Sequence, residues 1–393
     1  MNEDKATRYH RLRRRALLLA AAWQAVLLAA FLVSGASQAL RDALARALHP
    51  LPAWLHSPST VLAFVAVVAV VYGLGALPMT FFAGFTLERR YGLSRQPAAS
   101  WLRDHLKAAA IGLAFTAAAA VWMYAWLEAA PGIWWLPTWA GVATAGVVTA
   151  WAAPVVLLPL FHRFAPLPDG ALRDRLLALA ARAGVPALGV FEWRTSDRTS
   201  RANAALTGIG RTRRIILSDT LIHDCKPEEV EAVVAHEVAH HARHDIWKAL
   251  ALDAAASLGA CLAADAALRA AVEPVGLQAL SDPAGLPVAG LAMTAVSWAV
   301  SPLQNAASRA HERRADRAAL DLTGNVNAFV GAMRRLGARN LSEASPSLLT
   351  RLFFHTHPPI DERIGFALAW SRERGPCADA GPKAPASVRD GGA

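Results

Sequence analysis

Charged side chains are scarce in this chain. Lys, Arg, Asp and Glu make up 18% of its 393 residues, whereas about 25% is typical of a soluble domain. Hydrophobic residues make up 54%, and the mean hydropathy is +0.29. These values exclude an ordinary soluble enzyme and predict a protein that lies largely within a lipid bilayer.

Cysteine is rare, and acidic residues are outnumbered by basic ones. The three cysteines, Cys225, Cys261 and Cys377, show no C-x-x-C spacing, so no disulfide framework is predicted. The 40 Lys and Arg residues exceed the 30 Asp and Glu residues, which gives a net charge of +10. The arginines lie beside apolar runs and form no stripe with interleaved aromatic residues. We interpret them as signals of membrane topology and expect no nucleic-acid partner.

Six apolar runs are long enough to cross a bilayer as helices, which takes about 20 residues. They cover residues 16–33, 61–87, 108–127, 133–161, 249–271 and 286–303. The first run follows a basic segment, as in a cleaved signal peptide, but it is longer than the apolar core of such a peptide. We therefore predict a multi-pass integral membrane protein with about six spans.

Two acidic residues, Asp253 and Asp265, interrupt the fifth apolar run. Carboxylates at this depth in a bilayer must face water or a polar partner. We expect them to line a water-filled chamber, and polar contacts between helices are the alternative.

The distribution of basic residues predicts which loops are cytoplasmic. The N-terminus and the loop 88–107 are rich in arginine, and the segments 162–248 and 308–393 fall on the same side of the membrane. The segment 40–55 is expected outside and is weakly amphipathic. Because both large inner segments hold the candidate catalytic residues, we predict an active site on the cytoplasmic side, in the inner membrane if the source is bacterial.

An H-E-x-x-H motif at residues 236–240 is the strongest functional signal. It follows Pro227 and two acidic residues, which are typical of a helix start. Residues four apart on a helix point in nearly the same direction, so His236 and His240 can hold one Zn²⁺ ion. Glu237 can then reach a water at the metal and act as the base of a zinc peptidase.

A zinc site needs a third protein ligand, and the E-x-x-x-D pattern of Glu312 and Asp316 is the best candidate. These side chains are four apart on a predicted helix, so one can bind the metal while the other orients a ligand histidine. His244 is a weaker candidate, because three imidazoles on one straight helix rarely reach the same ion. The short distances from His240 and Glu312 to the neighbouring spans predict that both metal-binding helices run straight into the bilayer.

The segment between the fourth and fifth spans is predicted to fold. Residues 169–183 form an amphipathic helical pattern that ends at Gly184. Three short strands are predicted at residues 189–194, 204–207 and 214–217. The edge of such a sheet can bind the backbone of an extended peptide.

Seven motifs follow one another along most of the chain. They are E-R-R-Y-G-L-S at 88–94, D-H-L-K at 104–107, F-A-P-L-P-D-G at 164–170, S-R-A-N-A at 200–204, H-E-V-A-H at 236–240, S-R-A-H-E-R-R-A-D at 308–316 and H-P-P-I-D-E-R at 357–363. In content and order they resemble the type I CAAX prenyl protease family. The resemblance implies a mainly α-helical, polytopic membrane protein whose zincin-like catalytic domain lies on the cytoplasmic side and carries a small β-sheet.

The resemblance also implies roles at a zinc centre with one Zn²⁺ per chain. It assigns the three zinc ligands to His236, His240 and Glu312. It assigns the base that activates water to Glu237. Asp316 matches a carboxylate that does not bind the metal itself but orients a histidine ligand.

Further implied roles concern the substrate. Asn203 and Ala204 match an edge strand that binds the substrate backbone, and His357 matches a histidine that stabilises the oxyanion. Arg363 is implied as a salt-bridge partner that braces the site. The chain departs from the family at Asp245, where the family has a histidine, and in its six predicted spans, where eukaryotic members have seven.

We therefore predict a membrane region at residues 1–161 with four spans, a zinc metallopeptidase domain at 162–374 with two more, and a disordered tail at 375–393. The predicted function is hydrolysis of peptide or protein substrates, including lipid-modified or membrane-associated ones, in the manner of CAAX-box processing. A quality-control protease of broad specificity would use the same chemistry. A metal or ion transporter is a further alternative, but transport needs no base at Glu237.

Overall fold

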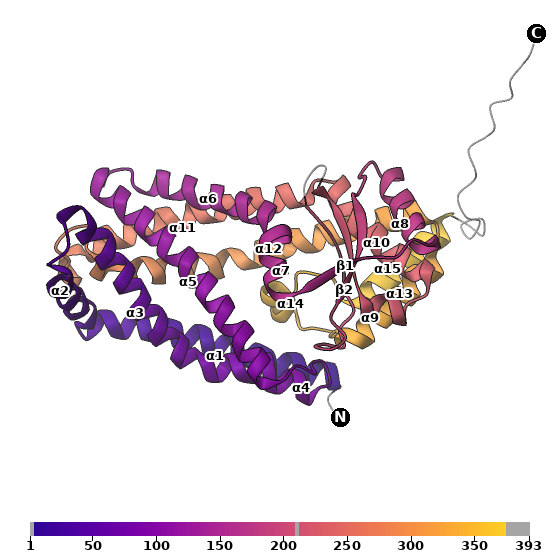
Figure 1. Ribbon diagram of the computed structural model, residues 1–393, viewed down its shortest axis with the longest axis horizontal. Helices are drawn as coiled ribbons and strands as arrows, with labels where there is room; N and C mark the ends of the chain where they lie inside the picture. Colours follow the sequence, from indigo (N-terminus) through magenta and orange to yellow (C-terminus); the bar gives the residue numbers. More distant parts are fainter. Residues whose placement is uncertain (1–3, 209–211, 375–393) are drawn as a thin grey trace, which may run out of the picture.

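The computed structural model describes residues 4–208 and 212–374. Long helices form a membrane bundle at one end of the molecule, and shorter helices around a small sheet form a compact unit at the other (Figure 1). The tail predicted to be disordered from residue 375 onward, with Cys377, lies outside the described residues.

Six described helical segments are long and apolar enough to cross a membrane, which confirms the predicted number. A short helix, α2 (Ala36–Leu48), overlaps the segment 40–55, which was predicted to be external. The bundle helices are α1 (Lys5–Val33), α3 (Ala53–Phe81) continued by the π-helical turn η1 (Phe82–Thr86) and α4 (Leu87–Arg90), α5 (Ala98–Ala129), α6 (Trp135–Ala152) continued by the π-helical turn η2 (Ala153–Leu157) and α7 (Leu158–Phe161), α11 (Asp245–Val275) and α12 (Leu286–Thr323).

Glycine allows close packing at two crossings of the bundle. A Cβ atom at Gly75 on α3 would overlap the indole of Trp23 on α1, whose Nε1 donates to the Tyr72 carbonyl at 3.2 Å. A Cβ atom at Gly141 on α6 would likewise lie 2.5 Å from Nε1 of Trp122 on α5. Small residues at such crossings let helices approach within a bilayer, where apolar burial gives no advantage over lipid.

Polar contacts tie the bundle together at the end remote from the compact unit (Figure 1). Ser37 of α2 donates to the Ala284 carbonyl at 2.7 Å, and Arg41 of α2 pairs with Asp282. The Asp282 carboxylate also accepts the backbone N–H of Ala284 at 2.9 Å. These contacts hold α2 against the 3₁₀ turn η4 (Pro283–Gly285) that precedes α12.

The acidic residues of the fifth span make contacts between helices. Asp265 accepts a hydrogen bond from Trp134 Nε1 at 2.6 Å and pairs with Arg269 at 2.9 Å. Asp253 accepts from the side-chain amide of Gln304 on α12 at 2.8 Å. These contacts agree with the alternative of polar contacts within the bundle, and the chamber stays a prediction.

The compact unit has a four-stranded sheet in the order β1-β2-β4-β3. Strands β2 and β4 are parallel and the other pairs antiparallel, so β3 forms one edge. The three predicted strands are confirmed, whereas β1 was not predicted, since it contains Pro166 and proline is rare in strands. The bounds are β1 (Arg163–Pro166), α8 (Ala171–Arg182), β2 (Gly189–Arg194), β3 (Ala204–Thr207), β4 (Arg214–Ser218), α9 (Asp219–Asp224), α10 (Pro227–Ala242), α13 (Val326–Asn340), α14 (Leu348–Phe354) and α15 (Ile360–Arg374).

A single hydrophobic core joins the sheet to the helices of the compact unit. Leu179 of α8, Val234 of α10 and Phe329 of α13 are all buried in it. Ala319 on the last turns of α12 belongs to the same core, so α12 continues from the bundle into the compact unit. Apolar burial of this kind fixes the position of α10 and α12 relative to each other.

The chain between α10 and α11 is not continuous helix. Helix α10 ends at Ala242, and His244 takes a left-handed conformation with φ of 56° before α11 begins at Asp245. The prediction that both metal-binding helices run straight into the bilayer is therefore right for α12 and wrong for α10. No glycine or proline marks this break in the sequence, so helical spacing gave no sign of it.

Candidate active site

Helix α10 carries the H-E-x-x-H motif and is well specified by its sequence. Pro227 occupies its first turn, and the Glu229 side chain accepts the backbone N–H of Lys226 at 2.9 Å. Both features stabilise a helix start. Val230 and Val234 bury one face of the helix in the core, which leaves His236 and His240 on the face toward α12.

Three side chains from α10 and α12 converge on one point. The Nε2 atoms of His236 and His240 lie 3.2 Å apart, and each lies 3.3 Å from a carboxylate oxygen of Glu312. One ligand atom from each residue falls within 4.8 Å of the other two. Among the described residues, this is the one group of its kind.

The donor set fits a zinc ion. Two imidazole nitrogens and one carboxylate oxygen are the ligands of many catalytic zinc sites, in which a fourth position stays open. Glu312 is buried, and its two carboxylate oxygens face the Nε2 atoms of the two histidines at 3.3 Å. A cation held by all three side chains would offset the free-energy cost of burying the carboxylate charge.

Each imidazole has a carboxylate behind it. Nδ1 of His236 lies 2.9 Å from Asp316, and Nδ1 of His240 lies 3.1 Å from Asp245. Such partners fix the orientation and tautomer of metal-binding histidines. The sequence indicated Asp316 but not Asp245, because only the break after α10 brings Asp245 back against His240.

The two carboxylates differ in their own support. Arg363 of α15 donates to both oxygens of Asp316, at 2.9 and 2.6 Å. Asp316, Arg363 and Glu312, which surround His236, are all buried. Asp245 pairs with Lys248 at 3.0 Å, and this lysine side chain is 45% exposed. The His236 side of the site is therefore enclosed, and the His240 side is open to solvent.

The surroundings shift the proton affinities of the α10 side chains. Burial alone would lower the pKa of His236, yet hydrogen bonds to Asp316 and Glu312 raise it to about 9. Burial raises the pKa of Glu237, which lines the cavity described below. A raised pKa makes a carboxylate a stronger base, which suits a group that must accept a proton.

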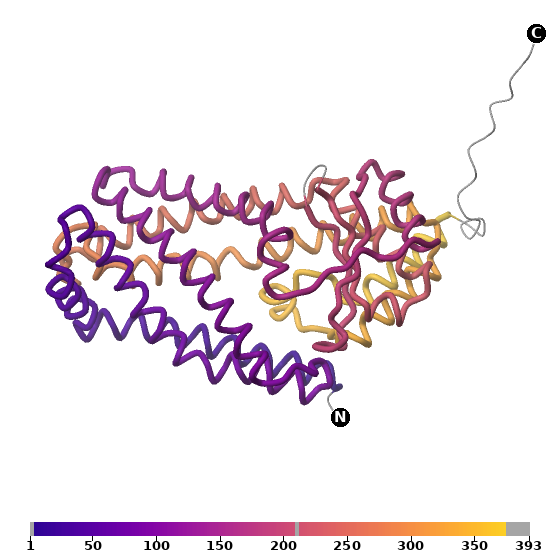
Figure 2. The backbone as a smooth tube through the Cα atoms, in the orientation of Figure 1, coloured from indigo at the N-terminus to yellow at the C-terminus, as the bar shows by residue number. Residues whose placement is uncertain are grey.

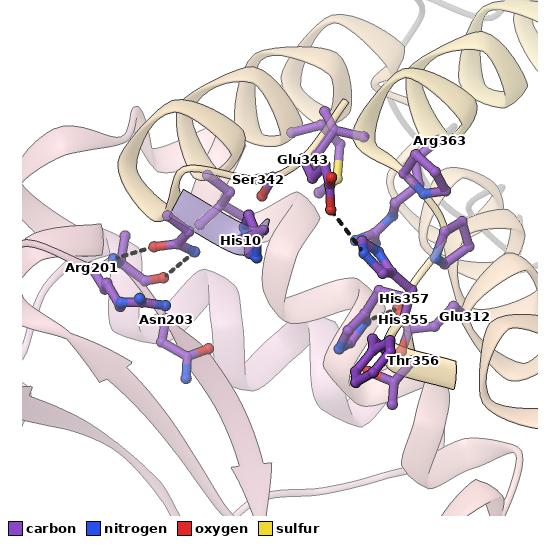
Figure 3. Close-up of a pocket in the computed structure, with 18 of the residues that line it drawn as sticks. His10, Arg201, Asn203, Glu312, Ser342, Glu343, His355, Thr356, His357 and Arg363 are labelled. Carbon is purple, nitrogen blue, oxygen red and sulfur yellow. Dashed lines mark hydrogen bonds and ion pairs between the residues drawn. The ribbon is translucent and has the colours of Figure 1, made fainter. Parts of the chain in front are cut away.

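A cavity of about 540 Å³ opens beside these residues. Its wall brings together side chains from α1, the β3 region, α10, α12 and the segment from α13 to α15 (Figure 3). The predicted site residues that line it are Asn203, Ala204, His236, Glu237, Glu312, His357 and Arg363. His244, by contrast, is exposed in the turn after α10 and does not belong to the metal group.

His357 lies in the segment between α14 and α15. Its Nδ1 is 2.8 Å from Oε2 of Glu312, and its side chain is 65% exposed. Figure 3 shows it projecting toward Glu312 across the cavity from Asn203. A histidine in this position lies within reach of both the carboxylate and a ligand in the cavity.

The first membrane helix forms part of the cavity wall, which the sequence did not predict. Figure 2 shows that α1 begins beside the compact unit and runs away from it. Arg14 of α1 pairs with the buried Glu343 at 2.5 Å, and His355 lies 3.3 Å from the same carboxylate. The basic N-terminal segment indicated topology alone, because nothing in its spacing relates it to residues more than 300 positions away.

The His–His–Glu site beside a bundle of membrane helices defines a membrane metalloprotease. Residues 166–371 match the family model for peptidase family M48, and residues 2–163 match a model described as CAAX prenyl protease N-terminal, five membrane helices. The chain belongs to peptidase family M48. Four of its six candidate spans lie in the N-terminal match, and α2, with 13 residues, is a further helix there.

Relatives occur in both bacteria and yeast. The uncharacterized metalloprotease YhfN of Bacillus subtilis is 30% identical over 308 residues, which cover 77% of this chain and 72% of YhfN. CAAX prenyl protease 1 of Saccharomyces cerevisiae is 27% identical, with 80% of this chain and 74% of the yeast protein covered. The crystal structure of S. mikatae Ste24p has the same fold, with a TM-score of 0.79 at 22% identity over 92% of this chain and 87% of that one.

Proposed function

We propose that this protein is a zinc-dependent membrane endopeptidase whose zinc ligands are His236, His240 and Glu312. The observation that carries the proposal is the convergence of these three side chains at the wall of a cavity that also contains Glu237. The donor set and the family both support zinc as the metal. When bound, zinc polarises a peptide carbonyl and makes a neighbouring water more acidic.

The residues around the metal site transfer the proton, stabilise the developing charge and orient the metal ligands. Glu237 accepts a proton from the attacking water and delivers it to the nitrogen of the leaving amine. His357 donates a hydrogen bond to the oxygen on which negative charge develops. Asp316 and Asp245 hold the two imidazoles in the orientation that directs Nε2 toward the metal, and Arg363 neutralises Asp316.

We propose that the substrates are C-a-a-X proteins with a lipid-modified cysteine. The N-terminal family match and the yeast relative support this substrate class. YhfN is described only as a metalloprotease, so the similarity to it supports the peptidase class, and a broader membrane quality-control protease is the alternative proposal. The two proposals share the same chemistry and differ only in what the cavity accepts.

Cleavage by purified protein in detergent separates these substrate classes. Farnesylated and unmodified forms of one C-a-a-X peptide would be compared with oxidised insulin B chain, a general endopeptidase substrate. A C-a-a-X protease cleaves the farnesylated peptide with a much higher kcat/KM than the other two. Similar rates for all three would support the broad protease, and no cleavage by zinc-loaded protein would contradict the endopeptidase proposal.

We further propose that the active site faces the cytoplasm and that a domain boundary lies near residue 161. The arginine-rich loops support this orientation, and the two family matches meet between residues 163 and 166. A reporter fused after Ala393 should then be cytoplasmic, and one inserted into the segment 49–52, after α2, should be external. A C-terminal reporter found outside would reverse the proposed orientation.

A further inference from the structure

The edge strand β3 directs alternate backbone groups away from the sheet. The N–H of Ser218 on β4 donates to the Asn203 carbonyl at 2.9 Å, so the backbone of Asn203 faces β4. In an antiparallel pair, residues that face the partner alternate with residues that face outward. The register of β3 with β4 therefore directs the N–H and C=O groups of Ala202, Ala204 and Leu206 outward.

Side chains already occupy the outward groups on both sides of Ala204. The side-chain amide of Asn340 binds Ala202 twice, since its Oδ1 accepts the Ala202 N–H at 3.2 Å and its Nδ2 donates to the Ala202 carbonyl at 3.1 Å. His241 lies with Nε2 2.7 Å from the Leu206 carbonyl. Within the described chain, no group hydrogen-bonds the outward N–H or C=O of Ala204, which lines the cavity with His236 and Glu237.

The two bonds from Asn340 reproduce what a neighbouring strand would supply. A primary amide offers one acceptor and two donors in a plane, like a peptide group. A strand residue opposite Ala202 would make the same pair of bonds with it. Asn340 therefore takes the place of one substrate residue at this position of the edge.

Asn340 is held firmly in this position. It is the last residue of α13, and Leu341 after it takes a left-handed conformation with φ of 50°. His10 of α1 lies with Nε2 2.8 Å from the Leu341 carbonyl, and the N–H of Ser342 donates to Gly337 at 2.9 Å. Contacts with α1 and within α13 thus fix the chain around Asn340, and both the Oδ1 and the Nδ2 atom of Asn340 form a hydrogen bond.

We propose that Asn340 is a specificity-determining residue that limits the substrate strand to a single reciprocal backbone pair, at Ala204. The proposal rests on the proposed peptidase function and deepens it. A substrate needs an extended backbone only next to the bond that is cleaved, and on the Ala202 side its chain must turn away from the edge or end. The site therefore favours short extended segments near a chain end or a turn over long strands.

A backbone N-methylation scan tests this limit, because N-methylation removes one backbone donor at a time. The probe is a peptide of about ten residues containing the bond that the wild-type protein cleaves, in the farnesylated C-a-a-X peptide or in oxidised insulin B chain. A peptide position is called sensitive here if its methylation lowers kcat/KM. In the wild type, we expect one sensitive position besides the scissile bond. Methylation there removes the donor to the Ala204 carbonyl and should lower kcat/KM about 10-fold. The residue two positions away, opposite Ala202, should tolerate methylation with a change below about 2-fold.

Asn340→Ala frees the Ala202 groups, so the same second position should become sensitive by about 10-fold. Asn340→Asp keeps the acceptor for the Ala202 N–H but removes the donor to the Ala202 carbonyl. It should therefore produce the same new sensitivity, and it serves if the alanine variant does not fold. Asn325→Ala is the matched control, because Asn325 caps the other end of α13 through the Ala328 N–H at 2.9 Å and lies outside the cavity.

The outcomes separate the two levels of the proposal. Two alternating sensitive positions in the wild type, or identical profiles for the wild type and both Asn340 variants, would overturn the role of Asn340 while cleavage itself persists. A new sensitive position in Asn325→Ala would also overturn it, since the change would not depend on the freed edge. Failure of the zinc-loaded wild type to cleave either probe would overturn the peptidase function and the inference together.

Discussion

The compact unit and the membrane bundle place charged side chains in opposite ways. The compact unit buries its charges at the centre, where His236, Glu312, Asp316 and Arg363 contact one another. The bundle keeps most of its charged pairs near helix ends, such as Asp282 with Arg41 on α2.

The difference follows from what surrounds each region. Core atoms exclude water from the centre of the compact unit, so a buried charge must find its partner within the protein. In the bundle, lipid covers the helix sides, and only the ends reach water and headgroups. Loss of a central charge should therefore cost much more than loss of a charge at a helix end, and the following experiments test that ranking.

Removal of a metal ligand should have the largest effect. Glu312→Ala leaves two imidazoles without the carboxylate that completes the site, so we expect loss of bound zinc and of peptide cleavage. Metal analysis of the purified protein measures the first and an activity assay the second. Asp321→Ala, an exposed change on the same helix, is the control and should keep both. Full zinc content in Glu312→Ala would remove this residue from the ligand set.

Removal of the base should come next. Glu237→Gln keeps the shape of the side chain and leaves the metal ligands unchanged, so zinc content and thermal stability should stay near wild type. Cleavage should fall by about 10²- to 10⁴-fold, because the proton of the attacking water has no acceptor. Glu231→Gln, on the same helix and outside the cavity, should cleave normally. A transporter would be indifferent to both changes.

Removal of the buried arginine should lower the stability of the compact unit. Arg363→Ala leaves the carboxylate of Asp316 buried with His236 alone, and loss of one partner of a buried ion pair costs about 3–5 kcal/mol. The free energy of unfolding in denaturant measures the change. Arg374→Ala breaks an ion pair whose side chains are 51% and 41% exposed, and it should cost less than about 1 kcal/mol. Equal losses in the two variants would contradict the ranking.

The carboxylate behind His240 should have an intermediate effect. Asp245→Asn keeps the size of the side chain but weakens the hydrogen bond that orients His240, so zinc affinity should fall by about 10- to 100-fold. Competition with a chelator of known affinity measures it. Asp224→Asn, in the compact unit and outside the cavity, should leave the affinity unchanged.

A charge in the bundle should matter least. In Asp265→Asn the amide oxygen still accepts from Trp134, and only the exposed pair with Arg269 is lost. We expect a loss of about 0.6 kcal/mol in thermal unfolding in detergent, the average for polar contacts between membrane helices. Zinc content and cleavage should not change. A loss as large as that of Arg363→Ala would show that the bundle depends on internal charges as the compact unit does.

Local patterns in the sequence determined the membrane spans and the helix faces that carry the metal ligands. Hydropathy alone fixed the six spans, because a bilayer requires long apolar helices with internally paired backbones. The four-residue spacings of His236 with His240 and of Glu312 with Asp316 determined which side chains share a helix face. Three of the four strands were predicted from short segments bounded by turn residues, and β1 was missed because it contains Pro166.

Only the tertiary structure decided how distant segments complete the cavity. Arg14 reaches Glu343, and Asn340 reaches Ala202, because packing of α1 and α13 against the compact unit brings them together. The left-handed conformation of His244 turns Asp245 back to His240, and a single strained residue leaves no periodic trace in a sequence. Periodicity reports which face of one element is buried, whereas contacts between elements depend on how those faces pack.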